Sequence, residues 1–90
     1  MIRVIIPSQL ASYTRGIREL ALDASACADL QQLTLALDEL FPGIRFRFVD
    51  EHGNIRRHIA IFIGETMVRT LDTPLRGHER VQIVGALSGG

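Results

Sequence analysis

The sequence contains little cysteine, no tryptophan and no long hydrophobic run. The single cysteine, Cys27, cannot form a disulfide within the chain, so we expect a reducing compartment and hence a cytoplasmic protein. The apolar start of the chain, residues 1–6, is broken by Pro7 and is too short for the apolar segment of a signal peptide. No stretch approaches the roughly 20 apolar residues of a membrane-spanning helix. These absences argue against a secreted or membrane-embedded protein.

Neither sign of charge is in excess. Ten acidic residues balance ten basic residues, and all ten basic residues are arginine. Because nucleic-acid-binding proteins usually carry a basic excess, we expect no nucleic-acid partner. The 90 residues suffice for one domain, and a 47% hydrophobic content can form a core without disulfides or a structural metal.

Short runs of β-branched and aromatic side chains, separated by glycine- or proline-containing turns, predict five strands. The expected strands span residues 2–6, 17–22, 45–49, 58–63 and 81–84. In the third of these, alternation directs Phe46 and Phe48 inward and Arg45 and Arg47 outward.

One amphipathic helix is predicted between the second and third strands. Its stripe consists of Leu30, Leu33, Leu37 and Leu40. The spacing predicts a helix over about residues 26–41, with Ser25 as N-cap and Asp29 in the first turn. Phe41-Pro42-Gly43 should end it, and Leu35 should be exposed on the opposite side. One helix covering a mixed sheet is an α+β arrangement.

Behind the last predicted strand the chain reads Gly85-Ala86-Leu87-Ser88-Gly89-Gly90. We expect a domain of residues 1–85 and a flexible tail of residues 86–90, because short glycine-ended tails of small residues seldom pack. A terminal Gly-Gly directly behind this order of elements is a specific pattern.

The whole chain resembles the ubiquitin-like β-grasp sulfur carriers of the ThiS/MoaD family. The matching segments are Arg57–Ile63 with Val68-Arg69, and Gly77–Val84 with the closing Gly89-Gly90. The length and the Arg-His-led central strand are most similar to the longer, CysO-like carriers used in cysteine assembly, or to those used in siderophore thioacid synthesis. The departures from the family pattern are Arg76 and His78 in place of acidic residues, Gly85 in place of a frequent proline and Ala26 in place of a Thr cap.

The resemblance implies a carrier and not an enzyme, with no catalytic residue, cofactor or metal of its own. A ubiquitin-activating-like adenylyltransferase would use ATP to adenylate the carboxylate of Gly90. A sulfur donor enzyme would then convert it to a thiocarboxylate for a downstream sulfur-accepting enzyme, such as a cysteine synthase. Leu87, Ser88 and Gly89 would thread the narrow active site as extended chain, where glycine has no Cβ to collide with the walls.

Strand parity predicts a docking surface beside the tail. If Ile59, Ile61 and Ile63 face the helix, their alternating neighbours face solvent, and the same holds in the last strand. The predicted partner surface consists of Ala60, Phe62, Gln82 and Val84.

Two other functions stay open at this point. One is a ubiquitin-like modifier that forms isopeptide bonds through Gly90, and the other is a non-covalent β-grasp interaction domain. The absence of lysine either reflects lineage bias, which we favour, or protects an activated terminus from amines.

Other reactive side chains favour plain structural interpretations. Cys27 is interpreted as a small core residue and not as a relay thiol. The three histidines, His52, His58 and His78, lack metal-type spacing. The pair Arg56-Arg57 is interpreted as a solvated strand edge in preference to a phosphate contact.

Overall fold

The structure is a computed structural model, and it describes residues 1–76 and 79–85. Its strands are β1 (Ile2–Ile5), β2 (Glu19–Leu22), β3 (Ile59–Ile63), β4 (Thr66–Val68) and β5 (Arg80–Gly85). Its helices are α1 (Leu30–Leu40) and α2 (Arg45–Phe48), and two 3₁₀ segments are η1 (Ser8–Thr14) and η2 (Ala24–Ala26). Within these described ranges, no helix has the length and apolar character needed to cross a membrane.

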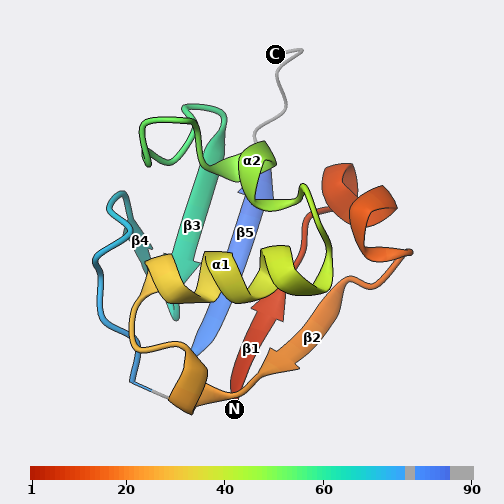
Figure 1. The fold of residues 1–90 in the computed structure, drawn as a ribbon. Coiled ribbons are helices and arrows are strands. Elements are labelled where there is room, and N and C mark those ends of the chain that lie inside the picture. The colour runs from red at the N-terminus through yellow and green to blue at the C-terminus, as the bar shows by residue number, and fades with distance from the viewer. Residues whose placement is uncertain (77–78, 86–90) are drawn as a thin grey trace.

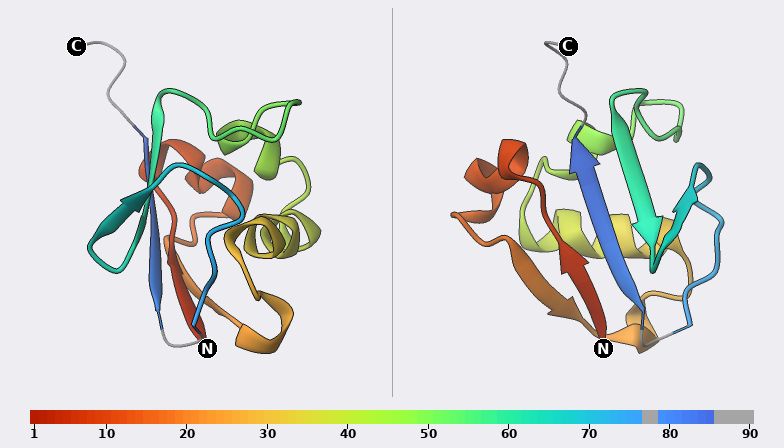
Figure 2. Two further views of the ribbon diagram at one scale, coloured as in Figure 1. Left: turned by 90° about the vertical axis from the view of Figure 1, so that its left-hand side faces the viewer. Right: turned by 180° about the vertical axis from the view of Figure 1, so that it is seen from behind.

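The strands form one mixed sheet in the order β2-β1-β5-β3-β4 (Figure 1). The central pair, β1 and β5, is parallel, and the other three pairings are antiparallel. Helices α1 and α2 lie on one side of the sheet, and no element of the described chain covers the opposite side (Figure 2). This arrangement confirms the expected α+β class, a mixed sheet packed on one main helix. It also brings β5 to the middle of the sheet, with its last residue at the end opposite to Met1.

The core lies between the sheet and α1. Alternate strand residues point into it, and the leucine stripe of α1 packs against them. Its fully enclosed members include Ile2, Val4, Ile61, Val81, Leu30, Leu33 and Leu37. Leu35 is 48% exposed, as expected, and Cys27 is buried. Leu40 was expected on the buried stripe but is 55% exposed; it is the last residue of α1 and lines a surface cavity with Leu22 of β2.

The start of α1 differs from the prediction. The N-cap is Asp29, whose Oδ1 accepts a hydrogen bond from the backbone N–H of Gln32 at 2.9 Å. Ser25, the expected cap, lies in η2, where its N–H and hydroxyl both donate to Asp23. A cap must reach the free N–H groups of the first turn, and Asp29 is one residue from that turn while Ser25 is five residues before it.

The predicted strand over residues 45–49 is wrong, because residues 45–48 form the short helix α2. Ile44 and Phe48, four residues apart, are both fully buried, whereas Phe46 is 54% exposed. Helical spacing therefore replaces the alternation that the sequence suggested. Arg45 turns toward α1 and donates to Thr34 Oγ1 at 2.9 Å and to Gln31 Oε1 at 2.8 Å. The fifth strand of the sheet is β4, at the edge next to β3.

Candidate functional site

The four residues predicted as a partner surface lie together on the uncovered face of the sheet. In the β3–β5 pairing, Ala60 lies opposite Val84 and Phe62 lies opposite Gln82. Directly paired residues share a face and have neighbouring Cβ atoms, so the four side chains form one group. All four are half-buried.

The register adds two residues to this group that the sequence did not reveal. Ile5 pairs with Gln82 across β1 and β5, and Met67 pairs with Phe62 across β3 and β4. Met67 is 53% exposed. Alternation along residues 2–6 was a usable signal for Ile5, whereas Met67 was missed because β4 was not predicted. We refer to Ile5, Ala60, Phe62, Met67, Gln82 and Val84 as the open-face patch.

Charged side chains on β2 and near the starts of β1 and β5 border the open-face patch. Arg3 donates to Glu19 Oε2 through Nε at 3.0 Å and through Nη2 at 2.7 Å. Arg80 lies opposite Arg3 in the parallel pairing and is exposed. An exposed ion pair of this kind adds little stability. The patch is thus a group of mostly apolar side chains around Gln82 with charged residues along part of its border, and a polar rim of this kind is common at protein-binding surfaces.

The tail begins at the end of β5. Gly85 is the last described residue of that strand, and its carbonyl accepts a hydrogen bond from Gln9 Nε2 at 3.2 Å. A Cβ at this position would lie 3.0 Å from the same Gln9 amide nitrogen. The 3₁₀ segment η1 therefore contacts the point at which the chain leaves the sheet. The predicted tail residues Leu87, Ser88, Gly89 and Gly90 lie outside the described residues.

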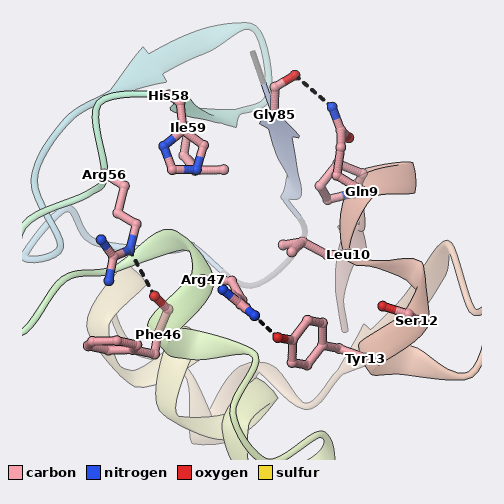
Figure 3. Close-up of a pocket in the computed structure, with 11 residues that line it drawn as sticks. Gln9, Leu10, Ser12, Tyr13, Phe46, Arg47, Arg56, His58, Ile59 and Gly85 are labelled. Atoms are coloured by element: carbon pink, nitrogen blue, oxygen red, sulfur yellow. Dashed lines mark hydrogen bonds between the residues drawn. The ribbon is translucent and has the colours of Figure 1, made fainter. Parts of the chain in front are cut away.

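A cavity of about 610 Å³ opens beside Gly85, between η1, α2 and the chain that enters β3 (Figure 3). Arg47 donates through Nε to the Tyr13 hydroxyl, and its guanidinium lies 5.2 Å from the centre of the Tyr13 ring. Arg56 donates through Nε to the Phe46 carbonyl at 2.8 Å, and its guanidinium lies 4.7 Å from the centre of the Phe46 ring. His58 also lines the cavity. We call this cavity the tail-root groove.

Cys27 has the environment of a core residue. Burial raises the pKa of its thiol, and the negative charge of Asp23 raises it further. The thiolate is the nucleophilic form, so a raised pKa makes this thiol a poor nucleophile at neutral pH. Across residues 1–76 and 79–85, no three His, Cys, Asp or Glu side chains come close enough together to hold a metal ion.

Neither the protein-family models nor the curated protein sequences give a match to this chain. Solved structures do. A chain of the BexX/CysO complex of Amycolatopsis orientalis is 22% identical, with a TM-score of 0.89 over 100% of both chains. CysO of Mycobacterium tuberculosis, described as an antigen, is 23% identical, with a TM-score of 0.87 over 97% of this chain and 100% of that one.

A third similar structure is SAMP1 of Haloferax volcanii, which is 19% identical, with a TM-score of 0.81 over 99% of this chain and 98% of that one. Another structure of the H. volcanii protein gives its full name, small archaeal modifier protein 1. At these identities the likeness establishes the fold. The chain has the ubiquitin-like β-grasp fold, as the sequence predicted.

Proposed function

We propose that this chain is a sulfur carrier whose reacting group is the carboxylate of Gly90. The observation that carries the proposal is the position of Gly89-Gly90, five residues at most beyond the end of β5 in a β-grasp domain. The strand that leads to this tail is central in the sheet, so the tail is attached to the most firmly paired part of the fold. A tail attached to this strand would let another enzyme bind the carrier through its C-terminal residues.

The chemistry needs a partner because an α-carboxylate, with a pKa of about 3.5, is ionised at neutral pH and is a poor electrophile. An adenylyltransferase would join the Gly90 carboxylate to the α-phosphate of ATP and release pyrophosphate. Hydrosulfide, sulfur at the sulfide oxidation level supplied by a donor enzyme, would then attack the Gly90 carbonyl carbon. The C–S bond forms, the C–O bond to AMP breaks, and a thiocarboxylate results.

The carrier contributes docking and reach to this sequence of reactions. The open-face patch offers an apolar surface next to β5, and Leu87 to Gly89 would extend into the partner's active site. The A. orientalis structure, in which a CysO occurs in a complex with BexX, supports a protein partner for this fold. The acceptor of the sulfur would be a downstream biosynthetic enzyme. Because its single cysteine cannot form a disulfide within the chain, we place the protein in a reducing compartment, the cytoplasm.

The proposal is tested by loading the chain with an adenylyltransferase, ATP and a sulfur donor. Deletion of Gly90 should abolish loading, because it shortens the reach by about 3.3–3.6 Å. Gly89→Val should impair it through added bulk in a channel suited to glycine. Ser8→Ala, an exposed change in η1, should load normally. Normal loading of the Gly90 deletion would refute the proposal.

A second candidate function is protein modification, in which the activated Gly90 forms an isopeptide bond with a lysine. The likeness to small archaeal modifier protein 1 favours it. Epitope-tagged protein expressed in its own host distinguishes the two functions. Lysine-linked conjugates that disappear on deletion of Gly90 would support modification, and an unconjugated chain that carries a thiocarboxylate would support sulfur transfer alone.

A further inference from the structure

The tail-root groove brings positively charged side chains together, although acidic and basic residues are equal in number over the whole chain. Two arginines, Arg47 and Arg56, line it together with His58, and no Asp or Glu lines it. The chain as a whole has no net charge. Among residues 1–76 and 79–85, no carboxylate lies within ion-pair distance of either arginine. The groove is therefore a local positive site on a neutral protein.

Asp50 is an acid that interacts electrostatically with Arg56, but its side chain is already engaged. Oδ1 of Asp50 accepts backbone N–H groups from His52 at 2.8 Å and Asn54 at 2.9 Å. These hydrogen bonds, first that from Asn54, lower the pKa of Asp50, and the positive charge of Arg56 contributes to the lowering. The negative charge of Asp50 therefore partly offsets the positive charge of Arg56, but Asp50 does not line the groove.

Both guanidiniums are held in place by groups that leave their outer edges available. Each arginine donates through Nε, Arg47 to Tyr13 and Arg56 to Phe46, and each lies against the ring of the same residue (Figure 3). Within the described part of the chain, the terminal nitrogens of neither arginine have a hydrogen-bond partner. A guanidinium fixed in this way loses little conformational entropy on binding, and its two terminal nitrogens suit the oxygens of a carboxylate.

We propose that the tail-root groove binds a carboxylate on the protein that takes up the tail, that is, an Asp or Glu of an acidic surface segment. Gly85 lines the groove and is the residue from which the tail follows, so the groove adjoins the place where a protein that takes up residues 86–90 would dock. The groove lies on the helix-covered side of the sheet and the open-face patch on the other side, and the two meet at the end of β5. A partner that contacts both would be oriented by charge and held by apolar contact. The identity of the partner rests on the proposed function, whereas the carboxylate site does not.

The site itself is tested on the full chain with sodium succinate as the probe, at constant ionic strength maintained with sodium chloride. Nuclear magnetic resonance signals of the Arg47 and Arg56 Nε–H groups should shift and saturate. Arg47→Gln or Arg56→Gln should weaken binding about tenfold, the usual effect of losing a charged hydrogen bond. Arg57→Gln is the matched control, because Arg57 is exposed beside Arg56 but does not line the groove.

The outcomes of this titration separate the alternatives. Saturable succinate binding that is weakened about tenfold in Arg47→Gln and Arg56→Gln and unchanged in Arg57→Gln supports the site. Shifts that do not saturate, or that are equal in all three variants, overturn it. Saturable binding of inorganic phosphate without binding of succinate would overturn the assignment to a carboxylate.

The role in docking is tested separately in the loading reaction. For Arg47→Gln and Arg56→Gln, the KM for the carrier should rise about tenfold and depend less on salt, with kcat little changed. An unchanged KM in both variants, with normal loading of the parent, would refute the docking role and leave the proposed function intact. If the parent does not load at all, the proposed function fails, and the succinate titration still decides whether the site exists.

Discussion

Replacement of Phe62 by alanine separates the docking role of the open-face patch from its structural role. Phe62 is half-buried and has two direct cross-strand neighbours, Gln82 on β5 and Met67 on β4. Each such pair contributes about 0.2–1 kcal/mol to the free energy of unfolding, so the loss should be about 1 kcal/mol. For a domain of this size, that lowers the melting temperature by about 4–8 °C.

The effect on partner binding should be larger than the effect on stability. A central aromatic residue at an interface typically contributes about 2 kcal/mol or more, which corresponds to about a thirtyfold increase in Kd. Val84→Asp should have a similar effect, because it places a charge in the apolar part of the patch next to Ala60. Calorimetric titration against the adenylyltransferase measures the affinity, and thermal unfolding measures the stability.

Leu35→Ala is the control for this experiment. Leu35 is 48% exposed on α1, on the other side of the sheet, so its truncation should leave the affinity unchanged. Unaltered affinity in both Phe62→Ala and Val84→Asp would refute the assignment of the open-face patch as a docking surface. Equal weakening in Leu35→Ala would show that the loss is not specific to this face.

Three further predictions concern the fold, and each is measured by denaturant unfolding. Cys27→Ala should lower stability by about 1 kcal/mol and leave sulfur loading unaffected. Because folding raises the pKa of Cys27, the stability of the parent should be constant below the unfolded thiol pKa of about 8.5 and should fall as the pH rises through the folded-state pKa. Cys27→Ala should remove this fall. If folded Cys27→Ala fails to load sulfur, Cys27 acts as a relay thiol after all. Asp29→Ala should cost about 1 kcal/mol through loss of the N-cap, and Ser25→Ala distinctly less; the reverse order would contradict the observed start of α1. Phe48→Ala should lower the free energy of unfolding by about 3–5 kcal/mol, and Phe46→Ala, at an exposed position, by much less. Similar losses in both variants would instead indicate a strand with both side chains in the core.

Periodicity was sufficient for most of the fold. Strands β1, β2, β3 and β5 and the stripe Leu30, Leu33 and Leu37 were predicted because each has a long enough apolar pattern of a single period. The segment at residues 45–49 was misassigned because Phe46 and Phe48 alternate as in a strand. Burial instead follows Ile44 and Phe48, which join the hydrophobic core while α2 packs against the preceding helix α1, and the alternation within residues 45–49 carries no sign of this tertiary packing.

The candidate site could be predicted only in part for a similar reason. Parity along β3 and β5 placed Phe62 and Val84 on one face, and the structure pairs both strands there. Met67 required the strand β4, which has only three residues and little pattern. The tail-root groove required η1, α2 and the end of β5 to come together at Gly85, and no local pattern in the sequence encodes that meeting. Arg56 was interpreted as part of a solvated strand edge, and no local pattern indicated its contacts with the carbonyl and ring of Phe46.

The central claim is tested most directly by mass spectrometry of the chain after incubation with its adenylyltransferase, ATP and a sulfur donor. A sulfur carrier activated at Gly90 should exchange one oxygen for sulfur, and fragmentation should locate the exchange at Gly90, where it is retained under reductant. Fragmentation is essential, because oxidation of Met1 or Met67 adds nearly the same mass. A whole added sulfur at Cys27 that reductant removes, or exchange that persists after deletion of Gly90, would contradict the account.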